Sequence, residues 1–266
     1  MFIHPEFDPI LLQIGPLAVR WYGLMYLLGF GAFWWLGCKR AAQKDSFMPV
    51  EQVSDFLFYA FLGVIIGGRI GSVFFYNFDY FLMRPFYLLE IWRGGMSFHG
   101  GLLGVIVAMA LYQRKQGWGL LRLADFVAPL VPLGLGLGRI GNFINGELWG
   151  RATDLPWGVV FPQIDQIARH PSQLYQAFLE GLVLFAILWI YSSRPRLTGS
   201  VSAAFLIFYG LFRFLVEYVR EPDGHLGFVA FDFLTMGQLL SLPMIVIGLL
   251  LFYYAQRGTF VREPQQ

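Results

Sequence analysis

The residues best suited to chemistry lie in one glycine-rich stretch near the middle of the chain. Residues 134–150 combine several glycines with one arginine, two amides and one acid, namely Arg139, Asn142, Asn145 and Glu147. A guanidinium presents paired N–H donors that match a phosphate, and glycine lets a ligand approach the backbone. Close helix packing explains small residues by themselves, but it does not explain this combination. The stretch therefore predicts a site for a phosphate-bearing ligand.

A second candidate is His99, which is flanked by glycines in segment 94–104. An imidazole with a pKa of about 6.5 can take a proton from a thiol with a pKa of about 8.5, and the mismatch costs about 2.7 kcal/mol. That cost is tolerable when the thiolate is needed only transiently. A histidine that caps its helix or is merely hydrogen-bonded is the plainer interpretation, and it stays open.

Three more charged residues lie inside apolar runs: Arg69, Arg213 and Glu217. An arginine at the centre of a span costs about 2.5–3.5 kcal/mol, so it must be paired, reach the interface or line a wet or ligand-filled cavity. Arg213 and Glu217 are four residues apart and could neutralise one another. Arg69 could pair with a carboxylate or backbone carbonyls, or support the site. Arg139 has no acid within one helical turn, so an ion pair within its own helix does not explain its place in an apolar run.

Metal and disulfide chemistry find little support in the sequence. The four histidines are scattered and show no spacing typical of metal ligands: His4, His99, His170 and His225. The single cysteine, Cys38, has no partner for a disulfide within one chain. We therefore expect no metal site, no structural disulfide and no catalytic thiol.

These residues must be positioned by membrane helices. The chain has 266 residues, of which 57% are hydrophobic and only 14% charged, whereas soluble domains carry about 25% charged residues. This composition excludes a water-soluble globule and a disordered chain, and a net charge of +2 is too small to imply nucleic acid as a partner. We predict an all-α integral membrane protein that forms a single polytopic domain over residues 1–266.

Seven apolar runs approach the roughly 20 residues that a membrane span needs. They are Val19–Leu36, Val53–Tyr76, Phe98–Tyr112, Phe126–Ile144, Leu174–Tyr191, Val201–Tyr218 and Phe233–Tyr254. Basic residues follow the first, third, fifth and seventh spans, and all three lysines lie on that side: Lys39, Lys44 and Lys115. By the positive-inside rule the C-terminus is cytoplasmic and the N-terminus outside.

Two segments are predicted to lie on the outer side. Residues 1–18 mix apolar residues with Glu6 and Asp8, show no cleavable signal peptide, and read as a segment at the outer interface. Residues 146–173 form a long loop that contains Trp149 and Trp157. Because its aromatic residues suit the headgroup region, we expect an ordered outer cap loop.

Five segments together resemble one family, the phosphatidylglycerol–prolipoprotein diacylglyceryl transferases. They are Gly138–Gly150, Phe98–Gly101, His170–Tyr175, Trp21–Tyr26 and Tyr209–Glu217. They are spread over nearly the whole chain and keep the family's order. The resemblance implies a seven-span protein of the bacterial inner membrane, with its active site toward the periplasm.

The resemblance also implies a reaction. The family moves the diacylglyceryl group of phosphatidylglycerol onto the lipobox cysteine of a prolipoprotein signal peptide, as the first step of lipoprotein maturation. A thioether forms, glycerol 1-phosphate leaves, and no cofactor is needed. The expected partners are therefore these two substrates and membrane lipids, with no nucleic acid.

Residue roles follow from the same resemblance. Arg139 and Arg213 are the expected phosphate clamp, and His99 is the favoured base. The expected substrate-binding residues are Tyr22, Arg69, Asn142, Asn145, Glu147, Tyr209 and Glu217. Acyl-chain preference, the identity of the base and oligomeric state are not fixed by the sequence.

Two other functions compete with this one. A lipid transporter or flippase would use the same arginines, and glycine-broken spans suit its discontinuous helices. It also predicts inverted repeats, and only Gly68–Gly71 and Gly138–Gly141 match one another. A purely structural protein leaves Arg139 unexplained.

Overall fold

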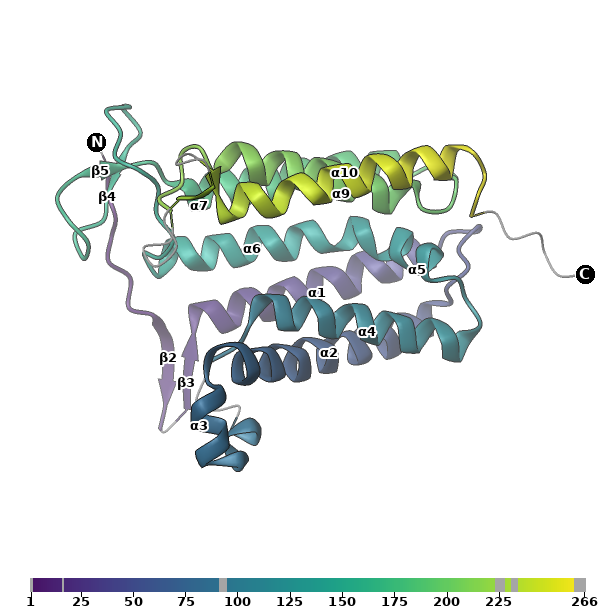
Figure 1. Ribbon diagram of the computed structural model, residues 1–266, viewed down its shortest axis with the longest axis horizontal. Helices are drawn as coiled ribbons and strands as arrows, with labels where there is room; N and C mark the ends of the chain where they lie inside the picture. The colour runs from purple at the N-terminus through teal and green to yellow at the C-terminus, as the bar shows by residue number, and fades with distance from the viewer. Residues whose placement is uncertain (1, 16, 91–94, 223–227, 231–233, 261–266) are drawn as a thin grey trace, which may run out of the picture. The chain divides into compact units, whose positions relative to one another are not determined.

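The computed structural model describes residues 2–15, 17–90, 95–222, 228–230 and 234–260 (Figure 1). Its contacts divide the chain into two compact units. The first comprises Met1–Trp35 with Asp125–Gln266, and the second comprises Leu36–Ala124. Both units are built mainly from helices, and several short strands modify the all-α prediction.

The first unit holds most of the helices. They are η3 (Ala128–Leu130), α6 (Val131–Ile144), α7 (Ser172–Gln176), η4 (Ala177–Val183), α8 (Leu184–Tyr191), α9 (Ser200–Val216) and α10 (Met236–Gln256). Helix α1 (Trp21–Ala41) belongs to this unit as far as Trp35. The helices α7, η4 and α8 follow one another without a break, and η4 is a π-helix. Figure 1 shows α9 and α10 side by side.

The second unit contains α2 (Val50–Tyr76), α3 (Phe78–Met83), η1 (Pro85–Leu89) and α4 (Phe98–Gln116), and α5 (Leu120–Val127) begins in it. Glycines bring α2 and α4 into backbone contact. A Cβ on Gly67 would lie 2.3 Å from the carbonyl oxygen of Gly100, and one on Gly104 would lie 1.9 Å from that of Gly63. This is the close packing that small residues permit between membrane helices.

Each predicted span overlaps helical residues in the part of the chain that the structure describes, but several ends differ. The first span does not start at Val19, because Leu17–Arg20 form strand β3, which pairs with β2 (Ile10–Ile14), and α1 begins at Trp21. The third span continues past Tyr112 to Gln116. There Gly117, with a φ of +74°, ends the helix in the left-handed conformation that glycine allows.

The seventh span was predicted to start at Phe233, which lies outside the described residues, as does His225. Its helix α10 begins at Met236 behind a capping box. The hydroxyl oxygen of Thr235 accepts a hydrogen bond from the backbone N–H of Gln238, and the Gln238 side chain accepts one from the Thr235 N–H. This reciprocal cap fixes where the helix starts.

Within the described residues, four helical stretches are long and apolar enough to cross a membrane: Val50–Tyr76, Leu120–Ile144, Ser172–Tyr191 and Met236–Gln256. Helix α9 is apolar but shorter. The chain is therefore a mostly helical membrane protein. The count of seven spans and the orientation of the termini stay predictions.

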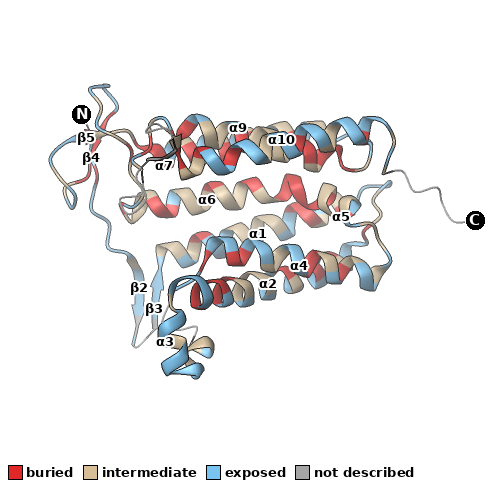
Figure 2. Cartoon of the chain, in the orientation of Figure 1, coloured by how far each residue is buried: buried red, intermediate tan, exposed pale blue. Residues whose placement is uncertain are grey.

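The core of the first unit packs α8 against α9. Its buried residues are Ala128, Leu184, Leu188, Val201 and Ala204, with aromatic side chains of α9 packed around them. By contrast, Figure 2 shows α3 largely exposed. Its last residue, Met83, is 80% exposed, and Phe86 in the following η1 is 79% exposed. Such apolar exposure suits a protein surrounded by lipid.

The N-terminal segment and the long loop share a small sheet. Strand β1 (Phe2–Ile3) pairs in parallel with β4 (Val159–Val160), which pairs antiparallel with β5 (Ala168–Arg169). Near the C-terminal end of the unit, β6 (Phe228–Ala230) pairs with β7 (Leu234–Thr235). Loop 146–173 is thus ordered by backbone pairing with residues 2–3.

Candidate active site

The polar residues of the glycine-rich stretch form a continuous chain of contacts at the end of α6. Nη1 of Arg139 donates to Oδ1 of Asn142 (3.4 Å), and Nδ2 of Asn142 donates to Oε2 of Glu147 (3.3 Å). Nδ2 of Asn145 donates to the other Glu147 oxygen (3.2 Å). The structure therefore brings together the four polar residues that the sequence singled out in this stretch.

Glycines in the same stretch let α1 approach α6. A Cβ on Gly141 would lie 2.9 Å from the ring of Tyr22, and a Cβ on Gly29 would lie 3.3 Å from the Cα of Gly134. Tyr22, a predicted substrate-binding residue, thus packs directly against the backbone two residues from Arg139. Its ring also meets Tyr26 edge to face, with centroids 5.2 Å apart.

Sequence reasoning missed the acid that faces Arg139. Oε2 of Glu180 lies 3.9 Å from Nε of Arg139, and the Glu180 side chain is 1% exposed whereas that of Arg139 is 23% exposed. Glu180 comes from η4, so no helical spacing links the two residues. The signal that could have found it is an ionisable residue within the predicted span Leu174–Tyr191, which is costly in a membrane and therefore functional by default.

Tyr209 and Arg213 of α9 extend this cluster. The hydroxyl of Tyr209 interacts electrostatically with both the Arg139 guanidinium and the Glu180 carboxyl group. Nη1 of Arg213 lies 2.6 Å from Oε1 of Glu217, so the pairing that their helical spacing allowed is present. Glu217 also binds Nη1 of Arg220 (3.1 Å) and accepts a hydrogen bond from the Thr235 hydroxyl (2.5 Å). The sequence indicated neither of these two extra partners.

The remaining predicted residues, Arg69 and His99, lie in the second unit. Arg69 is buried and donates to the carbonyl oxygens of Leu88 (3.2 Å), Tyr87 and Gly95 (3.4 Å). Its guanidinium carbon also lies 4.3 Å from the centre of the Tyr87 ring. Of the alternatives left open for Arg69, these contacts match pairing with backbone carbonyls.

His99 lies in the first turn of α4 and is exposed. The capping role belongs to Ser97, whose hydroxyl oxygen accepts a hydrogen bond from the backbone N–H of Gly100 (3.2 Å). The imidazole meets the ring of Phe98 edge to face, with centroids 5.5 Å apart. The interpretation of His99 as a helix cap is therefore wrong, and its role as a base stays a prediction.

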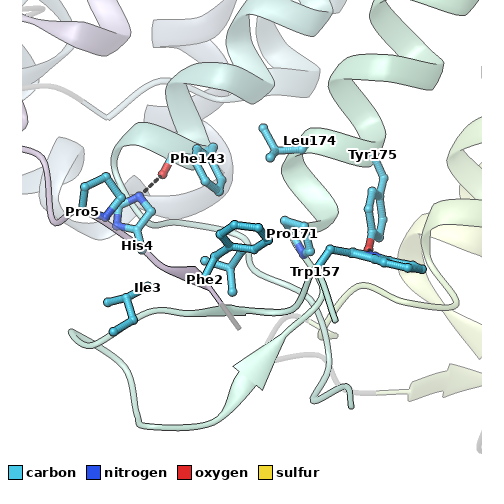
Figure 3. A pocket seen from close by; sticks show the side chains of 10 residues that line it. Phe2, Ile3, His4, Pro5, Phe143, Trp157, Pro171, Leu174 and Tyr175 are labelled. Carbon is cyan, nitrogen blue, oxygen red and sulfur yellow. Dashed lines mark hydrogen bonds between the residues drawn. The ribbon is translucent and has the colours of Figure 1, made fainter. Parts of the chain in front are cut away.

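An apolar cavity of about 450 Å³ lies beside the end of α6, between the N-terminal segment and loop 146–173 (Figure 3). His4 stands at its edge, and its Nε2 donates to the carbonyl oxygen of Phe143 (2.7 Å). On the other side, Nε1 of Trp157 donates to the hydroxyl of Tyr175 (2.8 Å). These contacts attach the N-terminal segment to the end of α6 and the loop to α7.

The loop also carries two groups with shifted pKa values. Partial burial lowers the pKa of His170, whose Nδ1 lies 3.3 Å from the Tyr175 hydroxyl. Hydrogen bonding from Arg169 lowers the pKa of the Asp165 carboxyl, and the two charged groups are 2.5 Å apart. Because of both shifts, the folded loop is more stable at neutral pH than at acid pH.

Comparison with known proteins assigns the chain to a family. A family model described as prolipoprotein diacylglyceryl transferase matches residues 9–254. A phosphatidylglycerol–prolipoprotein diacylglyceryl transferase of Vibrio atlanticus is 58% identical over 264 residues, covering 98% of this chain and 96% of the relative. Proteins of the same name from Aliivibrio salmonicida and Solidesulfovibrio magneticus are 62% and 58% identical. Each alignment covers 94% of this chain, with 88% and 95% of the respective relatives.

Proposed function

Since this chain belongs to the prolipoprotein diacylglyceryl transferase family and is a membrane transferase that modifies lipoproteins, we propose that it transfers the diacylglyceryl group of phosphatidylglycerol to the lipobox cysteine of a prolipoprotein. The product is a thioether, and glycerol 1-phosphate is released. The observation that carries the proposal is the setting of Arg139. Its guanidinium lies between Asn142 and Glu180, and its side chain keeps 23% exposure through which an anion can reach it.

The chemistry requires a cation at the phosphate. The thiolate sulfur attacks the glyceryl carbon, the carbon–oxygen bond to the phosphate breaks, and its electron pair passes to the phosphate oxygen. Negative charge therefore grows on the leaving phosphate monoester. Arg139 stabilises that charge in a site shielded from water, where a fixed donor is worth most. Arg213 adds a second guanidinium, held in place because Glu217 binds its Nη1.

The other predicted residues receive supporting roles. The exposed imidazole of His99 takes the proton of the cysteine thiol. The hydroxyls of Tyr22 and Tyr209 donate to the headgroup, and the remaining substrate-binding residues keep the arginines oriented or bind the headgroup: Arg69, Asn142, Asn145, Glu147 and Glu217. The lipid reaches the site sideways from the membrane. The reaction needs no cofactor, because the lipid phosphate is itself the leaving group.

The membrane arrangement is part of the proposal. We propose a single polytopic domain with seven spans in the inner membrane of a bacterium, with the N-terminus and the active site on the periplasmic side and the C-terminus in the cytoplasm. The placement of Lys39, Lys44 and Lys115 supports this orientation. Residues 1–18 then lie at the outer interface beside the cap loop 146–173, with which β1 pairs.

The test is direct. Purified protein in detergent is incubated with phosphatidylglycerol and a synthetic peptide that carries a lipobox cysteine, and the peptide mass is measured. We expect an increase equal to one diacylglyceryl group, and no increase when serine replaces the peptide cysteine. An unmodified peptide from folded protein would refute the proposal. Movement of headgroups across vesicles without any chemical change would favour the transporter instead.

A further inference from the structure

We propose that Glu180 is a positioning residue of the transferase reaction, which orients the Arg139 guanidinium for the leaving phosphate; the inference rests on the function proposed above. Glu180 is fully buried and belongs to the π-helical turn η4. Short π-helical segments are rare and occur frequently at functional sites. The only acid within 4 Å of Arg139 among the described residues is this one, at 3.9 Å.

The backbone geometry makes this pairing possible. A Cβ on Gly136 would lie 3.0 Å from the Cα of Gly181, and a Cβ on Gly181 would lie 2.7 Å from the Cα of Gly136. Gly181 directly follows Glu180, and Gly136 precedes Arg139 by one helical turn. The close approach of α6 and η4 at these two glycines therefore sets the distance between the carboxylate and the guanidinium.

Glu180 and Glu217 differ in how closely their carboxylates contact their partners. Glu217 is buried in the same unit, and its partners Arg213, Arg220 and Thr235 lie 2.5–3.1 Å away. Neither carboxylate oxygen of Glu180 has a hydrogen bond of normal geometry within the described residues. A distance of 3.9 Å also exceeds the roughly 2.7–2.9 Å of a strong charge-assisted hydrogen bond.

Glu180 thus faces one side of the guanidinium without consuming its donors. The Glu180 carboxylate faces the Nε atom of Arg139, whereas the Nη1 atom of Arg139 donates to Asn142. An unsatisfied buried carboxylate costs free energy, so its presence needs a compensating role. Fixing the direction of the Arg139 fork is such a role, because a misplacement of about 1 Å in an active site can lower turnover about 100-fold.

Glu180 belongs to a row of buried polar side chains along α7 and η4. Gln173, Gln176 and Glu180 are spaced three and four residues apart, and all three are fully buried. Nε2 of Gln173 donates to the backbone carbonyl oxygen of Glu147 (2.6 Å). The helical stretch α7–η4 therefore meets the glycine-rich stretch at two places, the backbone of Glu147 and the side chain of Arg139.

The test replaces Glu180 by glutamine, which keeps the size and removes the charge. We expect kcat to fall at least 10-fold in Glu180→Gln, whereas KM for phosphatidylglycerol stays equal or falls. Inhibition by added glycerol 1-phosphate should be unchanged or tighter, because a negative charge near Arg139 has been removed. Glu180→Asp keeps the charge and should recover part of kcat. Glu51→Gln, an exposed acid in the first turn of α2, is the matched control.

Two outcomes overturn the inference. A normal kcat in Glu180→Gln refutes it, and so does a parallel loss of kcat, of lipid affinity and of melting temperature, which indicates a packing role. If Glu180→Gln does not accumulate in membranes, Glu180→Asp decides. A kcat within twofold of wild type contradicts positioning, and a loss of more than twofold at unchanged KM supports it. Absence of product from the wild-type protein would instead refute the proposed function.

Discussion

Gly136 and Gly181 touch through their backbones, and this contact brings Arg139 within 3.9 Å of Glu180. The two glycines belong to helices that are far apart in the sequence. A methyl group at either position would push the helices apart by several tenths of an ångström or more. The geometry around the arginine therefore depends on two residues that carry no side chain.

We predict that Gly181→Ala lowers both activity and stability. The added methyl group overpacks the contact with Gly136, which costs about 1–3 kcal/mol of unfolding free energy, and the shift of η4 displaces Glu180. Activity should fall at least 10-fold, measured as modified peptide per minute. The control is Gly31→Ala in α1, where a Cβ meets nothing within 4 Å and stability should not fall. Equal activity in the two variants would contradict the prediction.

Arg139→Ala should abolish turnover while the protein still inserts into the membrane. The substitution removes the guanidinium that stabilises the leaving phosphate, and loss of one such donor typically costs about 100- to 1,000-fold in rate. Arg139→Lys keeps the charge but lacks the planar fork, so it should recover little. Peptide mass spectrometry measures turnover, and membrane content is measured by immunoblot. Substantial turnover by Arg139→Ala would exclude the clamp.

His99→Ala should remove most of the turnover, because the thiol loses its proton acceptor. Raising the pH toward the thiol pKa of about 8.5 should restore part of the rate, since more of the peptide is then thiolate. A pH–rate profile of both proteins tests this. A variant with wild-type kinetics at pH 7 would assign the base elsewhere.

Cys38→Ser should change little. Cys38 lies in α1 near its C-terminal end, and the reacting thiol belongs to the peptide substrate. The same mass assay measures the variant. Complete inactivity of Cys38→Ser in folded protein would show that a thiol of the enzyme takes part and would contradict the mechanism.

Mild acid should destabilise the cap loop through His170. Its pKa is lowered in the folded state, so the unfolded chain binds more protons between the ordinary value of about 6.5 and the folded value. Stability from this group is therefore fully present above pH 6.5 and is lost as the pH falls through the lowered pKa. Melting temperatures from pH 8 to pH 4 test this, and His170→Gln should flatten the decline. An unchanged decline in that variant would exclude His170 as its cause.

Much of the site was predictable because its parts are local in sequence. Arg139, Asn142, Asn145 and Glu147 lie within one short stretch, and the pair Arg213 and Glu217 follows from helical spacing. The positions of the helices followed from the apolar runs, since each run must be long enough to span a bilayer.

The missed features depend on contacts between distant segments. Glu180 reaches Arg139 only because two glycines let α6 and η4 meet, and a π-helix departs from the 3.6-residue period on which the prediction rested. Likewise, Thr235 reaches Glu217 from strand β7, directly before α10. The hairpin of β2 and β3 replaced the first residues of the predicted first span, because an apolar run does not by itself distinguish strand from helix.

The central claim is that Arg139 stabilises a phosphate that sulfur displaces, and the stoichiometry of the products tests it most directly. Phosphorus NMR follows glycerol 1-phosphate while mass spectrometry follows the peptide in the same reaction. We predict one glycerol 1-phosphate released for each diacylglyceryl group gained, and neither product with Arg139→Ala. Modified peptide without released glycerol 1-phosphate, or both products at the wild-type rate from Arg139→Ala, would contradict the claim.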